Sequence, residues 1–456
     1  MTIAVISLGC PKNLVDTEVM LGLLDERGHL FSADVEGADI VIVNTCSFIS
    51  AAVDESLDVI EECVSLKREG RVGRVVVAGC LPQRYGRSTW EMSEGVDGVI
   101  GCSDVQHIVD AVDAVFEGKR VEMISEPRFL YDEGSPRVLG TPGHLAYVKI
   151  AEGCDNRCSY CTIPGIRGRL RSREPASVVR EVEELAGLGV REVNLIAQDT
   201  SAYGTDIASG VTLAGLLEAL DGSTVPWIRV LYAHPAHITQ ELLETISAVP
   251  VVVPYLDIPI QHVSDRMLAA MRRHVTGGRI RALFRRAREV IPGLAIRSSV
   301  MVGFPGETEE EFAELLAFVS SGAVDHLGVF EYSPEKGTPA AALPGQVDSD
   351  IAASRAGRLV DAMEQLTAAR NQHLVGEVAT VLVDEVDEGD GPSTIGRTVR
   401  QAWEMDGVVR LVAPSHDVMP GDFVEIRITG ADGFDLLAEG LPGGSRQALT
   451  GRPETA

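Results

Sequence analysis

A chain of 456 residues is too long for one hydrophobic core, so we expect two or three domains. Apolar residues make up 45% of the chain, but no run approaches the roughly 20 residues that cross a bilayer, which argues against a transmembrane protein. The net charge of −27 disfavours a general binder of nucleic-acid backbones and favours a basic partner. The first residues lack the features of a signal peptide, so we expect a cytoplasmic protein.

Residues 1–117 alternate short apolar runs with helical patterns. Strands are expected at 3–8, 39–43, 74–78 and 99–100, and helices at 16–27, 51–68 and 104–116. Such alternation predicts a parallel sheet covered on both faces. The next segment, residues 118–142, is polar and contains three prolines, so we expect a linker there.

Residues 143–372 repeat the strand–helix pattern in longer units. Strands are expected at 147–150, 192–197, 228–232, 255–260, 296–302 and 327–330, and helices at 176–186, 213–220, 282–290, 307–320 and 351–374. Six or so such units predict a complete or partial TIM-type barrel, whose chemistry lies at the C-terminal ends of its strands.

The remainder of the chain has short strands separated by Gly- and Asp-rich turns. Strands are expected at 378–383, 394–399, 408–411 and 423–428, which predicts a small all-β barrel over residues 373–440. Residues 441–456 are rich in Gly and Pro and are expected to be a disordered tail. The expected fold class is therefore multidomain α/β, with a parallel-sheet domain, a TIM-type barrel and a terminal β-barrel.

The strongest motif in the chain is a C-x3-C-x2-C triplet, Cys154, Cys158 and Cys161, directly after an expected strand. In a large cytoplasmic protein, cysteines more often serve metal or redox chemistry than disulfides. A cubane iron–sulfur cluster has four irons, so three thiolates leave one iron open. An open iron can chelate S-adenosylmethionine (SAM), and an electron passed through the cluster can then release a 5′-deoxyadenosyl radical.

Two other metal sites fit this motif less well. Zinc normally takes a fourth Cys or His, and the nearest, His144, precedes the strand. A ferredoxin-type cluster would show x2 spacing throughout and a fourth cysteine. With Tyr160 before its last cysteine, the motif resembles that of the radical SAM superfamily. This resemblance implies that the Tyr160 backbone lies against the adenine of SAM, and simple packing of Tyr160 is the alternative.

A second set of cysteines, Cys10, Cys46 and Cys80, is spread over the first domain, and each follows an expected strand. Because parallel strands end at one edge of their sheet, these thiols are expected to converge there. Gly9 and Gly79 would allow tight turns beside them. The three thiols could hold a second cluster with an open iron, and independent buried cysteines are the alternative.

The surroundings of this second set resemble the N-terminal domain of the methylthiotransferase family. The matching segments are SLGCPKNLVD at 7–16, NTCSF at 44–48 and GCLPQR at 79–84. The resemblance implies that the three cysteines bind an auxiliary [4Fe–4S] cluster carrying the sulfur to be inserted. It extends over nearly the whole chain, because the terminal β-barrel resembles the TRAM domain of these enzymes. Cys63, expected in mid-helix, and Cys102, which follows the 99–100 strand, lie outside the pattern.

Enzymes of this family modify either tRNA adenosine or a protein. Four segments resemble the branch that modifies ribosomal protein S12: GCPKN at 9–13, AEGCDNRC at 151–158, YLDIPIQH at 255–262 and GFPGET at 303–308. This resemblance implies methylthiolation of the β-carbon of an S12 aspartate, with two [4Fe–4S] clusters and SAM as cofactors. An electron donor and a sulfur source would be further partners.

The charge of the terminal β-barrel is consistent with a protein substrate. Residues 373–439 contain fourteen Asp and Glu residues against four arginines, whereas an RNA-binding barrel is expected to be basic. An acidic barrel suits a basic ribosomal protein. A merely solvated acidic surface is the alternative.

Several other polar residues lie at expected strand ends or near the cluster motif. One of Arg167, Arg169, Arg171 and Arg173 could clamp the substrate carboxylate, whereas Arg279, Arg281, Arg285, Arg286 and Arg288 are more typical of a surface helix. Gln198 and Asp199 are candidate SAM contacts. His234 and His262 are interpreted as structural.

Two rival functions stay open. A tRNA adenosine methylthiotransferase would modify tRNA and leave S12 unchanged. An iron–sulfur electron carrier or assembly scaffold would not cleave SAM after anaerobic reduction.

Overall fold

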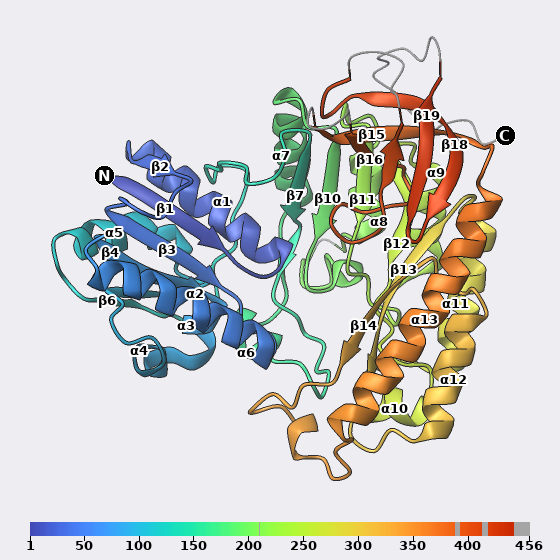
Figure 1. Ribbon diagram of the computed structural model, residues 1–456, viewed down its shortest axis with the longest axis horizontal. Coiled ribbons are helices and arrows are strands. Elements are labelled where there is room, and N and C mark those ends of the chain that lie inside the picture. The colour runs from blue at the N-terminus through green and yellow to red at the C-terminus, as the bar shows by residue number, and fades with distance from the viewer. Residues whose placement is uncertain (209, 388–392, 413–417, 442–456) are drawn as a thin grey trace.

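The computed structural model describes residues 1–208, 210–387, 393–412 and 418–441, and it divides into three units along the chain (Figure 1). The expected disordered tail therefore lies almost entirely outside the described residues. Within these residues, no helix combines the length and the apolar character needed to span a membrane.

The first unit is a six-stranded parallel sheet in the order β2-β1-β3-β4-β5-β6. Its strands are β1 (Thr2–Ser7), β2 (Leu30–Ser32), β3 (Ile40–Thr45), β4 (Arg74–Gly79), β5 (Gly98–Gly101) and β6 (Val121–Met123). Its helices are α1 (Pro11–Glu26), α2 (Ser50–Arg68), α3 (Cys80–Tyr85), α4 (Thr89–Met92) and α5 (Ile108–Phe116). Helices α1 and α5 cover one face and α2 covers the other, so every residue of the central strand β3 is buried.

Two expectations for this unit are wrong in detail. Helix α1 begins at Pro11 and not at Asp16, because a proline fits the first helical position, where its missing N–H leaves no bond unmade. The segment 118–142 is not wholly a linker, since β6 pairs with β5 and extends the sheet. The rest of the segment is also anchored, because the buried Tyr131 hydroxyl accepts a 2.7 Å hydrogen bond from Lys149 N.

The second unit is a partial TIM-type barrel, an open parallel sheet in the order β14-β13-β12-β11-β10-β7. Its strands are β7 (Leu145–Lys149), β10 (Glu192–Ile196), β11 (Trp227–Val230), β12 (Val252–Asp257), β13 (Ala295–Val302) and β14 (His326–Glu331). Its longer helices are α7 (Pro175–Gly187), α8 (Leu213–Ala219), α9 (Gln240–Ala248), α11 (Gly277–Val290), α12 (Glu309–Ser320) and α13 (Ser349–His373). Short elements complete it: β8 (Ala151–Glu152), β9 (Arg171–Ser172), α6 (Ile163–Arg167) and α10 (Asp265–Ala270).

The third unit is a closed five-stranded barrel in the order β15-β16-β17-β19-β18. Its strands are β15 (Val378–Asp387), β16 (Ser393–Arg397), β17 (Val409–Leu411), β18 (Phe423–Asp432) and β19 (Asp435–Gly440), of which β19 was not expected from the sequence. It packs on the N-terminal ends of the second unit's strands. Arg397 lies 2.7 Å from Glu192 at the start of β10, and Phe423 contacts Trp227 at the start of β11.

The first unit lies against the open side of the partial barrel (Figure 1). On the β7 edge, Val15 and Val19 of α1 share an apolar cluster with Leu145 and Tyr147. On the β14 edge, the buried Glu335 carboxylate accepts a 2.6 Å hydrogen bond from Ser50 N at the start of α2. Contacts at both edges thus place the cysteine-bearing edge of the first sheet beside the barrel.

Candidate active site

The C-x3-C-x2-C triplet lies in the loop between β8 and α6, at the C-terminal end of β7. The pKa of the Cys154 thiol is raised to about 11 and that of Cys161 to about 12, chiefly by burial and in part by the charge of Cys158. The three cysteines are partly exposed, and three thiols grouped in this way form a donor set that a cationic cluster would stabilise. Tyr160 is buried against Met267, in an apolar cluster that Cys158 and Cys161 also contact.

One thiol of this triplet has a buried cationic neighbour. Arg273 Nη1 lies 3.5 Å from Cys158 Sγ, while its Nη2 donates to the carbonyl of Pro259. No pattern in the sequence indicated Arg273, because this contact joins residues that are 115 positions apart.

The structure brings Cys10, Cys46 and Cys80 together at the C-terminal edge of the first sheet. Burial raises the pKa of Cys46 to about 11, and the thiolates of Cys80 and Cys10 add to that effect. Gly9 has φ +91°, and a Cβ there would lie 2.6 Å from the Cys46 Cβ. Only glycine therefore permits the close approach of the Cys10 and Cys46 loops.

The spacing of both triplets fits a cluster better than a single ion. Zinc holds sulfur at about 2.3 Å, which places its ligands within about 4 Å of one another. Across the described parts of the chain, the one group of three Cys, His, Asp or Glu ligands within 4.8 Å of one another is Asp199, His234 and His237. The cysteine triplets are more widely spread, as expected where each thiolate binds a different iron.

Cys80 has the most polar surroundings of the second triplet. Its pKa is lowered to about 6 by a hydrogen bond from Cys102 and by the Arg167 guanidinium, whose Nη2 lies 3.2 Å from Cys80 Sγ. Cys102 is thus a fourth thiol beside the triplet, which the sequence left undecided. Cys63 is 2% exposed in the middle of α2, as expected for a packing residue.

Arg167 also joins a buried charge network between the two units. Its Nη1 lies 2.6 Å from Asp16 of α1 and 3.2 Å from Glu152 of β8. Lys149 contacts the same two carboxylates, at 2.5 and 2.8 Å. Gln198 Nε2 donates to Glu152, and the buried Gln198 Oε1 has no partner among the described residues. That free acceptor keeps Gln198 a candidate contact for SAM.

Lys12 is a further buried cation at this boundary, besides Arg167 and Lys149. Its Nζ lies 3.0 Å from the ring centroid of Tyr232, just past the end of β11. Burial lowers the Lys12 pKa to about 8. The sequence placed Lys12 in a matching segment but gave no signal that it reaches into the barrel.

Asp199 belongs to a hydrogen-bonded group with two histidines. Although burial opposes it, contacts with His237, His234 and Ser201 lower the Asp199 pKa to about 2. Asn156, from the cysteine loop, donates to the same carboxylate at 2.7 Å. A cavity of about 220 Å³ opens beside this group and is lined by Cys154, Asn156, Asp199 and His237, among others.

The other polar residues singled out from the sequence are mostly engaged in structural contacts. Arg169 pairs with Asp155 at 2.8 Å and its side chain is 87% exposed, so it points away from the site. Arg173 is buried against Glu181. His262 is also buried, with Nε2 3.2 Å from Glu307, which supports its structural interpretation.

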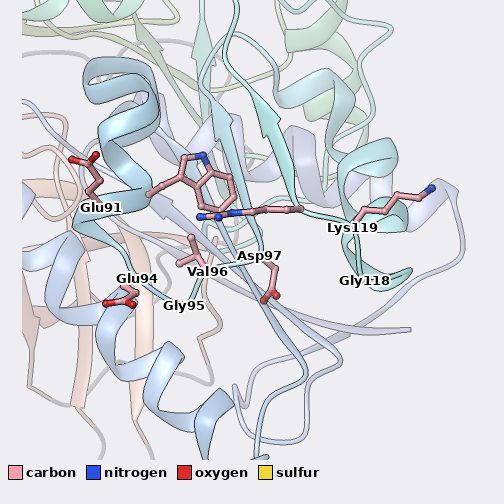
Figure 2. A pocket seen from close by; sticks show the side chains of 9 residues that line it. Glu91, Glu94, Gly95, Val96, Asp97, Gly118 and Lys119 are labelled. Atoms are coloured by element: carbon pink, nitrogen blue, oxygen red, sulfur yellow. The ribbon is translucent and has the colours of Figure 1, made fainter.

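A surface hollow of about 690 Å³ is not part of this site (Figure 2). It is lined by residues that include Glu91, Glu94 and Asp97, which precede β5, and Lys119, which precedes β6. It therefore lies at the N-terminal edge of the first sheet, opposite the cysteines.

Comparisons with known proteins assign each unit to a family. The radical SAM superfamily model matches residues 148–319, the TRAM domain model matches 375–440, and the uncharacterized protein family UPF0004 model matches 2–101. A solved radical S-adenosylmethionine methyltransferase, TsrM from Kitasatospora setae, aligns with a TM-score of 0.55 and 17% identity over 86% of this chain and 79% of its own. At that identity it shows a shared fold.

Curated relatives match almost the full length. Ribosomal protein uS12 methylthiotransferase RimO of Syntrophus aciditrophicus is 45% identical over 96% of this chain and 98% of its own. The enzyme of the same name from Syntrophotalea carbinolica is 46% identical, with 96% of each chain covered. The chain therefore belongs to the ribosomal protein uS12 methylthiotransferase family of radical SAM enzymes.

Proposed function

We propose that this enzyme methylthiolates the β-carbon of an aspartate in ribosomal protein S12. The observation that carries the proposal is the Arg167–Cys80 contact. Arg167 lies six positions after Cys161, yet it bonds a thiol of the other triplet. Two three-cysteine sites in such proximity suit a reaction that needs a radical and a sulfur atom at one carbon.

Each triplet would hold one [4Fe–4S] cluster: Cys154, Cys158 and Cys161 in the barrel, and Cys10, Cys46 and Cys80 in the first unit. With the clusters and two SAM molecules bound, the cofactors supply the radical, the sulfur and the methyl group. Gln198, through its unpartnered Oε1, would contact SAM, and the Tyr160 backbone would lie beside its adenine.

The protein's own residues orient the cofactors and exclude water. The Asp16–Lys149–Glu152–Arg167 network is almost fully buried, so it fixes the two units without water between them. The terminal barrel closes the N-terminal ends of the strands, which leaves their C-terminal ends as the route for substrate.

The acidic terminal barrel supports a basic protein as partner. Several of its carboxylates are used internally, such as Asp384 with Arg397 and Asp406 with Tyr255. Others are exposed and available to a partner: Glu377, Glu385, Glu404, Glu425, Asp432 and Glu439. We infer that S12, free or on the ribosome, meets this surface in the cytoplasm. An electron donor and a sulfur source complete the set of partners.

Anaerobic reconstitution followed by incubation with SAM, a reductant and either S12 or tRNA tests this function. Mass spectrometry is expected to show one methylthio group on an S12 aspartate and none on tRNA. Modified tRNA with unmodified S12 would favour the tRNA enzyme. A reduced protein that leaves SAM intact would favour an electron carrier or scaffold.

A further inference from the structure

Lys12 extends from the cysteine-bearing edge of the first unit into the barrel. It lies two residues after Cys10, and its ammonium reaches the ring of Tyr232 in the barrel. The charge of Cys10 acts on it first, and those of Asp257 and Glu152 act on it from the barrel side. Glu152 lies two residues before Cys154. Lys12 is therefore close to both places where the proposed cofactors would bind.

Within the described parts of the chain, the Lys12 ammonium makes no hydrogen bond to a carboxylate, although the Cys10 thiol is its neighbour. The residue is 8% exposed, and among the residues that the structure describes no carboxylate or other acceptor lies within hydrogen-bonding distance of its Nζ. A cation over an aromatic face is only partly compensated for the loss of water. A buried charge of this kind is expected to be paired when the site is filled.

The neighbouring charged groups are already committed. Asp257 Oδ1 lies 3.2 Å from Arg297, and its Oδ2 accepts a hydrogen bond from Tyr232 N. Glu152 is held by Lys149, Arg167 and Gln198, as described above. Lys12 thus stands apart from the other buried cations at the boundary, each of which has an acceptor.

The backbone beneath this cation is itself unusual. Tyr232 has φ 62°, the left-handed region that non-glycine residues rarely adopt. Such conformations persist where the surrounding structure imposes them, and they cluster at ligand sites. Here the conformation carries the Tyr232 ring under the Lys12 ammonium, at the C-terminal end of β11.

We propose that Lys12 binds the side-chain carboxylate of the substrate aspartate and so places its β-carbon between the two triplets. This inference rests on the proposed function, because it assumes an aspartate substrate. The carboxylate is bonded directly to the carbon that reacts, so a cation that fixes it also fixes that carbon. An ion pair in a dry site is favourable only when both partners are present, which makes Lys12 selective for aspartate over asparagine.

Two peptides and three variants of the reconstituted, full-length enzyme test the assignment. The peptides carry the S12 target sequence with either Asp or Asn at the modified position. Lys12→Met removes the charge and keeps the length of the side chain, and Lys12→Arg keeps the charge. Lys119→Met, on the exposed surface of the first unit, is the matched control. The readouts are the peptide Kd in the presence of SAM, the KM for SAM and 5′-deoxyadenosine release without peptide.

The wild type and Lys119→Met are expected to bind the Asp peptide about 10- to 100-fold more tightly than the Asn peptide, the usual range for a charge-assisted hydrogen bond. Lys12→Met should bring this ratio close to one, while Lys12→Arg should restore most of the ratio. If Lys12→Met keeps the wild-type ratio of affinities for the Asp and Asn peptides, the assignment is overturned. An unchanged ratio with a raised KM for SAM would assign Lys12 to the SAM carboxylate instead. If the wild type modifies neither peptide, the proposed function fails and the inference fails with it.

Discussion

Arg167 Nη2 lies 3.2 Å from Cys80 Sγ across the boundary between the barrel and the first unit. The same guanidinium contacts Asp16 from the first unit and Glu152 from the barrel. One side chain thus connects the docking of the two units to the environment of a proposed cluster ligand.

Arg167→Met is expected to lower the free energy of unfolding by about 3–5 kcal/mol, because it leaves buried carboxylates without one of their cations. Urea unfolding followed by circular dichroism measures this change. Arg169→Met is the matched control two positions further on, since its pair with Asp155 is exposed and contributes little to stability. Equal effects of the two substitutions would show that Arg167 does not hold the units together.

Glu335 provides a second connection at the β14 edge. Its carboxylate lies 2.8 Å from Arg84, and both side chains are almost fully buried. Glu335→Gln and Arg84→Met should each destabilise the protein, and a double-mutant cycle should give a coupling free energy of about 0.5–3 kcal/mol. Glu331→Gln, exposed on β14, is expected to change little. Additive effects of the first two substitutions would contradict a direct contact between these residues.

A pH dependence is expected from His234. Burial and the nearby Arg273 charge lower its pKa to about 3, against a usual value near 6.5. The unfolded chain then binds a proton that the folded protein does not, so stability is full above about pH 6.5. Below that pH it falls by about 1.4 kcal/mol per pH unit.

Unfolding free energies measured between pH 7 and 5 check the His234 prediction. In His234→Gln the unfolding free energy should fall less steeply as the pH decreases from 6.5. His107→Gln, at an exposed position, should leave this slope unchanged. A slope that survives in His234→Gln would assign the proton uptake to another group.

The sequence predicted the elements whose apolar runs are long, and it missed those fixed by tertiary contacts. The six barrel strands and the two cysteine triplets follow from periodicity and from position after strands. Strand β6 is three residues long and β19 follows a tight turn, so neither has a clear pattern of its own.

The partners of the cysteines could not be predicted in the same way. Arg167 was expected as a possible substrate clamp, but it is buried against Cys80, 87 positions away. The contact of Arg273 with Cys158 depends on the folding of the barrel. The contacts of Glu335 and Lys12 depend on how the two units dock. Local propensity carries no information on such docking.

The iron content of the reconstituted wild type, Cys46→Ala and Cys158→Ala proteins is the most direct test of two separate cubane sites. About eight irons per chain in the wild type and about four in each variant are expected, because each substitution removes one cluster and leaves the other. About four irons in the wild type, with a complete loss in either variant, would contradict the presence of two clusters.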